Sequence, residues 1–204
     1  KYYKAELLYP DNSWKTIKYR LRGRNIWHWD KNKPSLRLKM PKDRLYDNQR
    51  NINLINPEDR SMVVNLLGEK IASSMGVLTH ITSYKKLFID DQYFGVYHQT
   101  TNDDEEMLRL NHRIPGPIYV GDNLKKIWDI KDFKVKGDLD VLSFIHPMEK
   151  LLKIINNKND IKQFNEIWDI FSIDKYAKYI AALTISGGIH SDYAHNQLFY
   201  FDPK

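Results

Sequence analysis

The segment best equipped for chemistry runs from His190 to Asn196 and reads His-Ser-Asp-Tyr-Ala-His-Asn. It carries a carboxylate at Asp192 and an amide at Asn196, four positions apart, just after an apolar run. Phosphoryl transfer uses such a pair, because a carboxylate orients the acceptor hydroxyl and takes its proton while an amide oxygen holds a metal ion that bridges the phosphates. We expect one loop to direct both side chains into one cleft.

Two other interpretations of this segment stay open. Asp192 and Asn196 are of the types that form turns, in which their side chains bond the loop backbone. His190 and His195 are of a type that binds zinc, copper or iron, although two histidines with one carboxylate make a weak site. The protein-kinase pattern H-R-D-x-x-x-x-N places Asn five positions after Asp, so this segment is related to it in form without being identical.

A second candidate site is the loop and strand between residues 22 and 39. Backbone amides of glycine-bearing loops and the side chains of Lys and Arg hold phosphates. The segment provides all of these groups, in Arg22, Gly23, Lys33, Arg37 and Lys39. If the extended conformation runs through residue 34, the last three cations share one strand face, opposite the apolar residues 36, 38 and 40. The alternative is a half-exposed strand with solvated basic residues.

The elements that must position these groups follow from periodicity. Apolar alternation predicts strands on either side of the loop at 22–34 and again at 83–89 and 93–97, joined by a polar turn at 90–92. A cap at Asn56 followed by Pro57 predicts a helix that ends at Gly76. In this helix Glu69 is the acid that could reach a strand lysine, against the default of a solvated glutamate.

The second half of the chain changes to helical periodicity. Amphipathic helices are predicted over 141–155 and 161–171, a buried helix over 173–185, and a short strand over 197–201. The fold class is therefore α+β, with a sheet-rich N-terminal lobe over about residues 1–100 and a helical lobe over about residues 101–204. We expect both lobes to form a single domain.

Composition excludes several classes of protein. The chain of 204 residues has no cysteine, which removes disulfides, thiolate nucleophiles and cysteine-bound metal sites. No apolar run reaches the roughly 18 residues of a membrane span. The net charge of +6 is spread along the chain, so solvated lysine explains it better than nucleic-acid binding does, and we predict no nucleic-acid partner.

Several motifs, in this order, resemble those of the CotH kinase family, named for a spore-coat protein. They are Arg22-Gly23, Lys33-Pro34-Ser35-Leu36-Arg37-Leu38, Met75-Gly76, Ile89-Asp90-Asp91-Gln92-Tyr93-Phe94-Gly95-Val96-Tyr97, Gly116-Pro117-Ile118-Tyr119, and His190-x-Asp192-x-x-His195-Asn196 followed by Leu198-Phe199-Tyr200-Phe201-Asp202-Pro203. The resemblance covers nearly the whole chain.

The resemblance implies a divergent protein-kinase-like fold that transfers phosphate from ATP to Ser or Thr of a protein substrate, with Mg²⁺ or Mn²⁺. By position, Asp192 would be the catalytic aspartate and Asn196 the metal ligand. Lys33 would bind phosphate, with Arg37 and Lys39 as alternatives and Arg22-Gly23 in the phosphate-binding loop. It also implies a location in a spore coat or at a cell surface.

Two departures from the family pattern favour a rival function. Thr101 stands where the family commonly has Glu, and the family's Trp-Asp metal element would follow Lys204, where this sequence ends. We therefore expect the domain to be incomplete at its C-terminal end. The rival function is a non-catalytic coat or surface scaffold that binds a partner.

Overall fold

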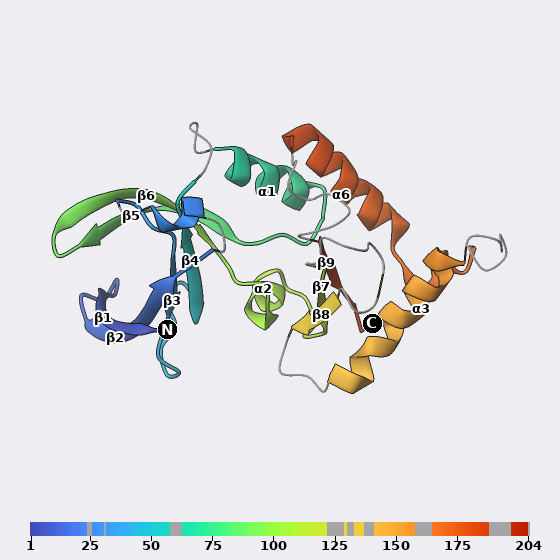
Figure 1. The fold of residues 1–204 in the computed structure, drawn as a ribbon, viewed down its shortest axis with the longest axis horizontal. Helices are drawn as coiled ribbons and strands as arrows, with labels where there is room; N and C mark the ends of the chain where they lie inside the picture. The colour runs from blue at the N-terminus through green and yellow to red at the C-terminus, as the bar shows by residue number, and fades with distance from the viewer. Residues whose placement is uncertain are drawn as a thin grey trace. The chain divides into compact units, whose positions relative to one another are not determined.

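The computed structural model describes residues 1–23, 26–30, 32–57, 63–121, 129, 133–136, 141–157, 165–187 and 197–203. The chain divides into two compact units, one of residues 1–69 with 80–102, the other of residues 70–79 with 103–204. Figure 1 labels most of the elements of both units. No helix among the described residues is both long and apolar enough to cross a bilayer.

The first unit is built on a six-stranded antiparallel sheet, in the order β1-β2-β3-β4-β6-β5. Its strands are β1 (Tyr3–Leu8), β2 (Trp14–Leu21), β3 (Leu36–Lys39), β4 (Asn51–Ile55), β5 (Thr82–Ile89) and β6 (Gln92–Thr100). The predicted strands in this half of the chain are confirmed, while β1 and β4 were not predicted. Asp90 and Asp91 join β5 to β6 with φ angles of 48° and 62°, the left-handed pair that a two-residue hairpin turn requires.

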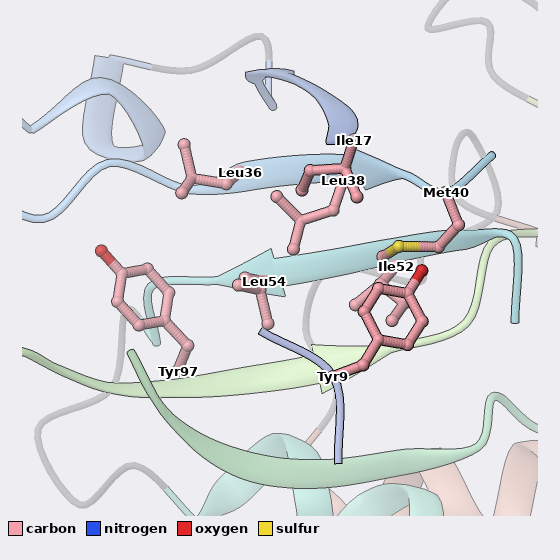
Figure 2. Close-up of a cluster of buried hydrophobic side chains, with 8 residues drawn as sticks. All are labelled: Tyr9, Ile17, Leu36, Leu38, Met40, Ile52, Leu54 and Tyr97. Carbon is pink, nitrogen blue, oxygen red and sulfur yellow. The ribbon is translucent and has the colours of Figure 1, made fainter. Parts of the chain in front are cut away.

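The core of this unit covers one face of the sheet, which we call the inner face. Side chains alternate between the two faces of a strand, so the apolar residues of β3 and β4 meet those of β2 and β6 on this side. Figure 2 shows the eight buried members, Tyr9, Ile17, Leu36, Leu38, Met40, Ile52, Leu54 and Tyr97. Tyr97 is fully buried.

The second unit is a small sheet with helices against both faces. Its strands, in the order β8-β7-β9, are β8 (Phe133–Lys136), β7 (Ile118–Gly121) and β9 (Gln197–Tyr200). Buried residues of α3 (Val141–Asn156) and Ile167 of α5 (Ile167–Ile170) pack with Tyr119. Met107 and Leu108 of α2 (Glu105–Leu110) pack with Ile118 on the opposite face. The second half of the chain therefore contains a sheet as well as helices.

Two helix predictions need correction. The helix expected to begin after Asn56 is described from Val64 as α1 (Val64–Ser74), and Asn56 follows β4 with its backbone N–H donated to Ser35 Oγ at 2.9 Å. Residues 58–62 of the predicted helix lie outside the described residues. The helix over 173–185 forms as α6 (Ile173–Ser186), yet only Ala182 in it is buried. The apolar residues of α6 lie all around the helix, so their number alone does not make α6 a core element.

Candidate functional site

The loop that leads from β2 into β3 is closed by hydrogen bonds around Ser35. The Arg22 N–H donates to the Ser35 carbonyl at 2.9 Å, which extends the β2–β3 ladder by one pair. The Ser35 N–H donates to the carbonyl of His28 at 2.8 Å, at the end of the 3₁₀ turn η1 (Ile26–Trp29). Ser35 is fully buried, so these bonds fix both the base of the loop and the start of β3.

Gly23 has a packing role in this loop. Its φ is +101°, and a Cβ there would lie 2.3 Å from the imidazole of His28. Only glycine allows the chain to pass this close to the ring in that conformation. The Gly23 carbonyl also accepts the indole N–H of Trp29 at 3.1 Å. Whether Arg22 and Gly23 also hold a phosphate stays a prediction.

Lys33 lies against the inner face of the sheet. Its Nζ is 5.4 Å from the ring centroid of Tyr97, within the range of a cation–π interaction. A Cβ on Gly95, two residues earlier in β6, would lie 3.3 Å from Lys33 Cε, so the missing side chain leaves room for the lysine stem. Among the described residues, no carboxylate forms an ion pair with Lys33.

Burial lowers the pKa of Lys33, because removal from water disfavours the charged amine. A cation in this position lacks the compensation that buried charges normally have. An anion placed next to Lys33 would supply that compensation. The amine therefore has the chemistry expected of a phosphate-binding lysine.

Tyr97 adds an unsatisfied polar atom beside this lysine. Its hydroxyl is buried and has no hydrogen-bond partner in the described part of the chain. Burial, with a smaller contribution from the negative charge of Asp30, raises the pKa of Tyr97 to about 12. The hydroxyl stays protonated at neutral pH and can donate a hydrogen bond.

Arg37 and Lys39 lie on the other face of the sheet, which we call the outer face. The prediction that they share a face with Lys33 is wrong, because regular strand geometry begins only at Leu36 and the bonds of Ser35 turn the preceding chain. Arg37 Nε donates to Asn53 Oδ1 at 2.8 Å, and Asn53 Nδ2 donates to the Thr101 carbonyl at 3.1 Å. The structure therefore separates the three cations.

Two positions were considered for a carboxylate that supports a lysine, and the residues at both positions have other partners. Thr101, which stands where the family commonly has Glu, is buried and its Oγ1 accepts the N–H of Ile81 at 3.3 Å. Glu69 Oε1 lies 3.3 Å from Nδ1 of His80. The Glu69 carboxylate thus contacts an imidazole, and the possible pairing with a strand lysine is not formed.

The predicted catalytic loop lies outside the described residues, and with it Asp192, Asn196 and both of its histidines. Their roles stay predictions. In the part of the chain that the structure describes, no three His, Asp or Glu side chains gather as metal ligands. The fit of a divalent metal therefore depends on residues outside this part.

Comparison with known proteins identifies the family. The sequence model described as CotH kinase protein matches residues 19–204. This chain belongs to the CotH kinase family. A search of curated proteins finds no match. The match includes Lys33, Gly95 and Tyr97, which we call the Lys33 site, and the segment that carries Asp192.

Sequence reasoning selected Lys33 but missed the part played by Gly95 and Tyr97. Both were part of the motif used for the resemblance, without any role in the site. Their signal was the spacing Gly-x-Tyr within a strand, which places both on one face. The sequence did not indicate that Lys33, more than 60 positions earlier in the chain, packs against this face.

Proposed function

We propose that this protein is an ATP-dependent phosphotransferase that acts on Ser or Thr of protein substrates with Mg²⁺ or Mn²⁺. Membership of the CotH kinase family supports this function at the level of reaction class. The observation that carries it is the partly buried amine of Lys33 over the ring of Tyr97, whose hydroxyl has no hydrogen-bond partner among the described residues. Such a group fits a nucleotide phosphate.

In this proposal Lys33 binds a phosphate oxygen of ATP. Burial lowers the pKa of the Lys33 amine, and a phosphate bound beside it would favour the charged form. A charge in a poorly solvated position attracts an anion more strongly than one in bulk water. The Tyr97 hydroxyl, which lacks a partner in the described region, would donate a hydrogen bond to the same ligand.

Asp192 acts on the acceptor. The serine or threonine hydroxyl gives its proton to the Asp192 carboxylate while its oxygen bonds to the γ-phosphorus, and the bond to the bridging oxygen breaks to release ADP. Asn196 is the proposed metal ligand from this chain. A divalent cation, when bound, would neutralise charge on the phosphates.

A non-catalytic scaffold that binds a partner at a spore coat or cell surface is the second candidate. The partners of Glu69 and Thr101 favour it, because neither provides a carboxylate to Lys33. In protein kinases a helix Glu pairs with the strand Lys and supports the active arrangement. A chain that lacks this pair would keep the fold without turnover.

The test is transfer of radiolabel from ATP to a serine-bearing protein, measured beside direct nucleotide titration on the full-length protein. Asp192→Asn should abolish transfer and leave nucleotide affinity largely unchanged, because the change conserves volume and removes only the base. Asn196→Ala should weaken metal-dependent nucleotide binding as well. Tyr193→Phe in the same segment serves as the control and should retain transfer.

Two results would contradict the proposal at different levels. A wild-type protein that binds neither nucleotide nor metal would exclude the phosphotransferase and leave the scaffold. Normal transfer by Asp192→Asn would remove only the role given to Asp192.

A further inference from the structure

The outer face of the first sheet carries a concentration of positive charge over β1, β2 and β3. In the strand register, Lys4 lies opposite Lys18, Lys18 opposite Lys39, and Arg20 opposite Arg37. Directly opposed residues share a face. We call these five residues the basic face, on the side of the sheet away from the buried core.

This arrangement is unfavourable for the isolated protein. Like charges directly opposite each other on neighbouring strands are destabilising. Glu6 shares the face, opposite Thr16. Yet no described carboxylate forms an ion pair with Lys4, Lys18 or Lys39. An external anionic surface would offset the repulsion that the fold itself leaves in place.

Exposed apolar side chains continue the same face toward the β1–β2 turn. Leu8 lies opposite Trp14 in the register that places Lys4 opposite Lys18. Leu8 is an even number of positions from Lys4, and Trp14 is an even number of positions from Lys18. Side chains alternate between the two faces along a strand, so Leu8 and Trp14 lie on the same face as these cations. Leu8 is 44% exposed and Trp14 61% exposed.

The outer face is covered over β4 and β6. Asn53, His98 and Thr100, on these strands, are all buried. They separate the basic face from Lys86, which is exposed on the outer face of the other edge strand, β5. Within the basic face, five cations adjoin an exposed leucine and tryptophan.

This combination fits one kind of partner better than the others. Proteins that bind single-stranded nucleic acid stack bases on exposed aromatic rings that lie among the cations. The centre of the basic face instead holds Lys18, Arg20 and Lys39. The nearby Tyr2 ring already contacts a cation, because it lies 5.6 Å from the Arg20 guanidinium. An acidic peptide could pair with the backbone of the edge strand β1, but that edge lies one strand away from Lys18 and two strands away from Lys39. A base could stack on Trp14, but Leu8 opposite it would then stay exposed to water, whereas a bilayer takes up both side chains.

We propose that the basic face, with Leu8 and Trp14, binds the surface of an anionic lipid bilayer. Lysine and arginine are attracted to anionic headgroups. Trp and Leu side chains enter the boundary between headgroups and acyl chains, where an indole keeps its N–H near water. The protein would lie on the bilayer surface without spanning the bilayer. This proposal is independent of the phosphotransferase proposal.

The experiment is co-sedimentation of the full chain with vesicles. One set contains phosphatidylcholine and phosphatidylglycerol in equal parts, and the other contains phosphatidylcholine alone. We expect binding to the anionic vesicles only, with an affinity that falls steeply as salt is raised. Lys18→Gln/Lys39→Gln should weaken it about 25-fold, since each lysine near such a surface contributes about fivefold.

Matched variants separate this surface from general charge and exposure. Lys15→Gln/Lys42→Gln removes the same charge, with Lys15 on the inner face of β2 and Lys42 in an exposed turn. That variant should bind within about threefold of wild type, as net charge alone is screened within a Debye length. Trp14→Ala should weaken binding, whereas Trp168→Ala, at an equally exposed residue of the second unit, should not.

Thermal unfolding of each variant confirms that the fold is intact. Lys18→Gln/Lys39→Gln should unfold at the same or a higher temperature, because it removes opposed like charges. Equal loss of binding in both lysine pairs, or equal binding to both vesicle sets, would overturn the proposal. So would tighter binding of a single-stranded RNA or a phosphoserine peptide with the same dependence on Lys18 and Lys39.

Discussion

The two faces of the first sheet hold the same residue types in opposite environments. On the inner face Lys33 lies over a buried tyrosine ring, and burial lowers its pKa. On the outer face Lys18 and Lys39 lie opposite each other in water-accessible positions. In our proposal, desolvation makes the first, Lys33, a site for one anionic group. Repulsion among exposed cations suits the second to an extended anionic surface.

The difference teaches that positive charge alone does not indicate a phosphate site. Arg37 and Lys39 are as basic as Lys33 and lie within six positions of it. What distinguishes Lys33 is the inner face, where Gly95 leaves space for its stem and Tyr97 has a hydroxyl without a partner among the described residues. The following predictions test this distinction, beginning with the largest effect.

Lys33→Met should weaken ATP binding by about 10- to 100-fold, because a hydrogen bond to a charged group contributes about 1.5–3 kcal/mol. Lys39→Met removes the same charge from the outer face and should change the affinity by less than about twofold. Isothermal titration of both variants measures the contrast. Equal losses would mean that the inner face has no special role.

Gly95→Ala tests the space that the lysine stem occupies. The residue has a φ of +107°, and its Cβ would meet Lys33 Cε at 3.3 Å. We expect a loss of about 1–3 kcal/mol in the free energy of unfolding from backbone strain, measured by urea titration, and weaker ATP binding because Lys33 must move.

Gly187→Ala is the control for backbone strain. Gly187 follows α6 with a φ of +66°, and no described atom outside its chain neighbours lies within 4 Å of its Cβ position. Its variant should lose about 1–2 kcal/mol of stability and bind ATP normally. If Gly95→Ala behaves in the same way, then contact with Lys33 is not functional.

Tyr97→Phe should produce the smallest effect at neutral pH. The variant removes a buried hydroxyl that has no partner in the described region, so stability should stay within about 1 kcal/mol of wild type. ATP binding should fall by about 2- to 10-fold if the hydroxyl donates to the ligand, the effect of one neutral hydrogen bond. Tyr119→Phe changes a buried tyrosine of the second unit whose hydroxyl also has no partner among the described residues, and it should leave ATP binding unchanged.

We also expect the stability of wild type and of Tyr97→Phe to depend differently on pH. The pKa of Tyr97 is raised from 10.0 to about 12 in the folded state. The folded protein therefore holds this proton more tightly than the unfolded chain, so the stability it contributes is present below pH 10 and is lost as pH rises toward 12. Urea titrations at rising pH should show a shallower loss for Tyr97→Phe than for wild type. Parallel slopes would contradict the environment assigned to this ring.

Local pattern was sufficient for much of the secondary structure. Alternation predicted β2, β3, β5 and β6, and the Asp90-Asp91 pair predicted the turn between the last two. The pattern around Asn56 predicted a helix that starts directly after it, whereas the described helix α1 begins at Val64 and the backbone N–H of Asn56 bonds the hydroxyl of Ser35. A partner 21 positions away leaves no trace in a local pattern.

The sequence by itself determined the family, the residue types available for phosphate chemistry and the alternation that divides each strand into two faces. Only the tertiary structure decided which cation faces which side. Lys33 precedes the regular part of β3, and the bonds of Ser35 set the direction of the chain there. Gly95 and Tyr97 reach Lys33 through the pairing of β6 with β4 and of β4 with β3. Strand periodicity is a local property, whereas sheet order depends on contacts between distant segments, and the Lys33 site depends on both.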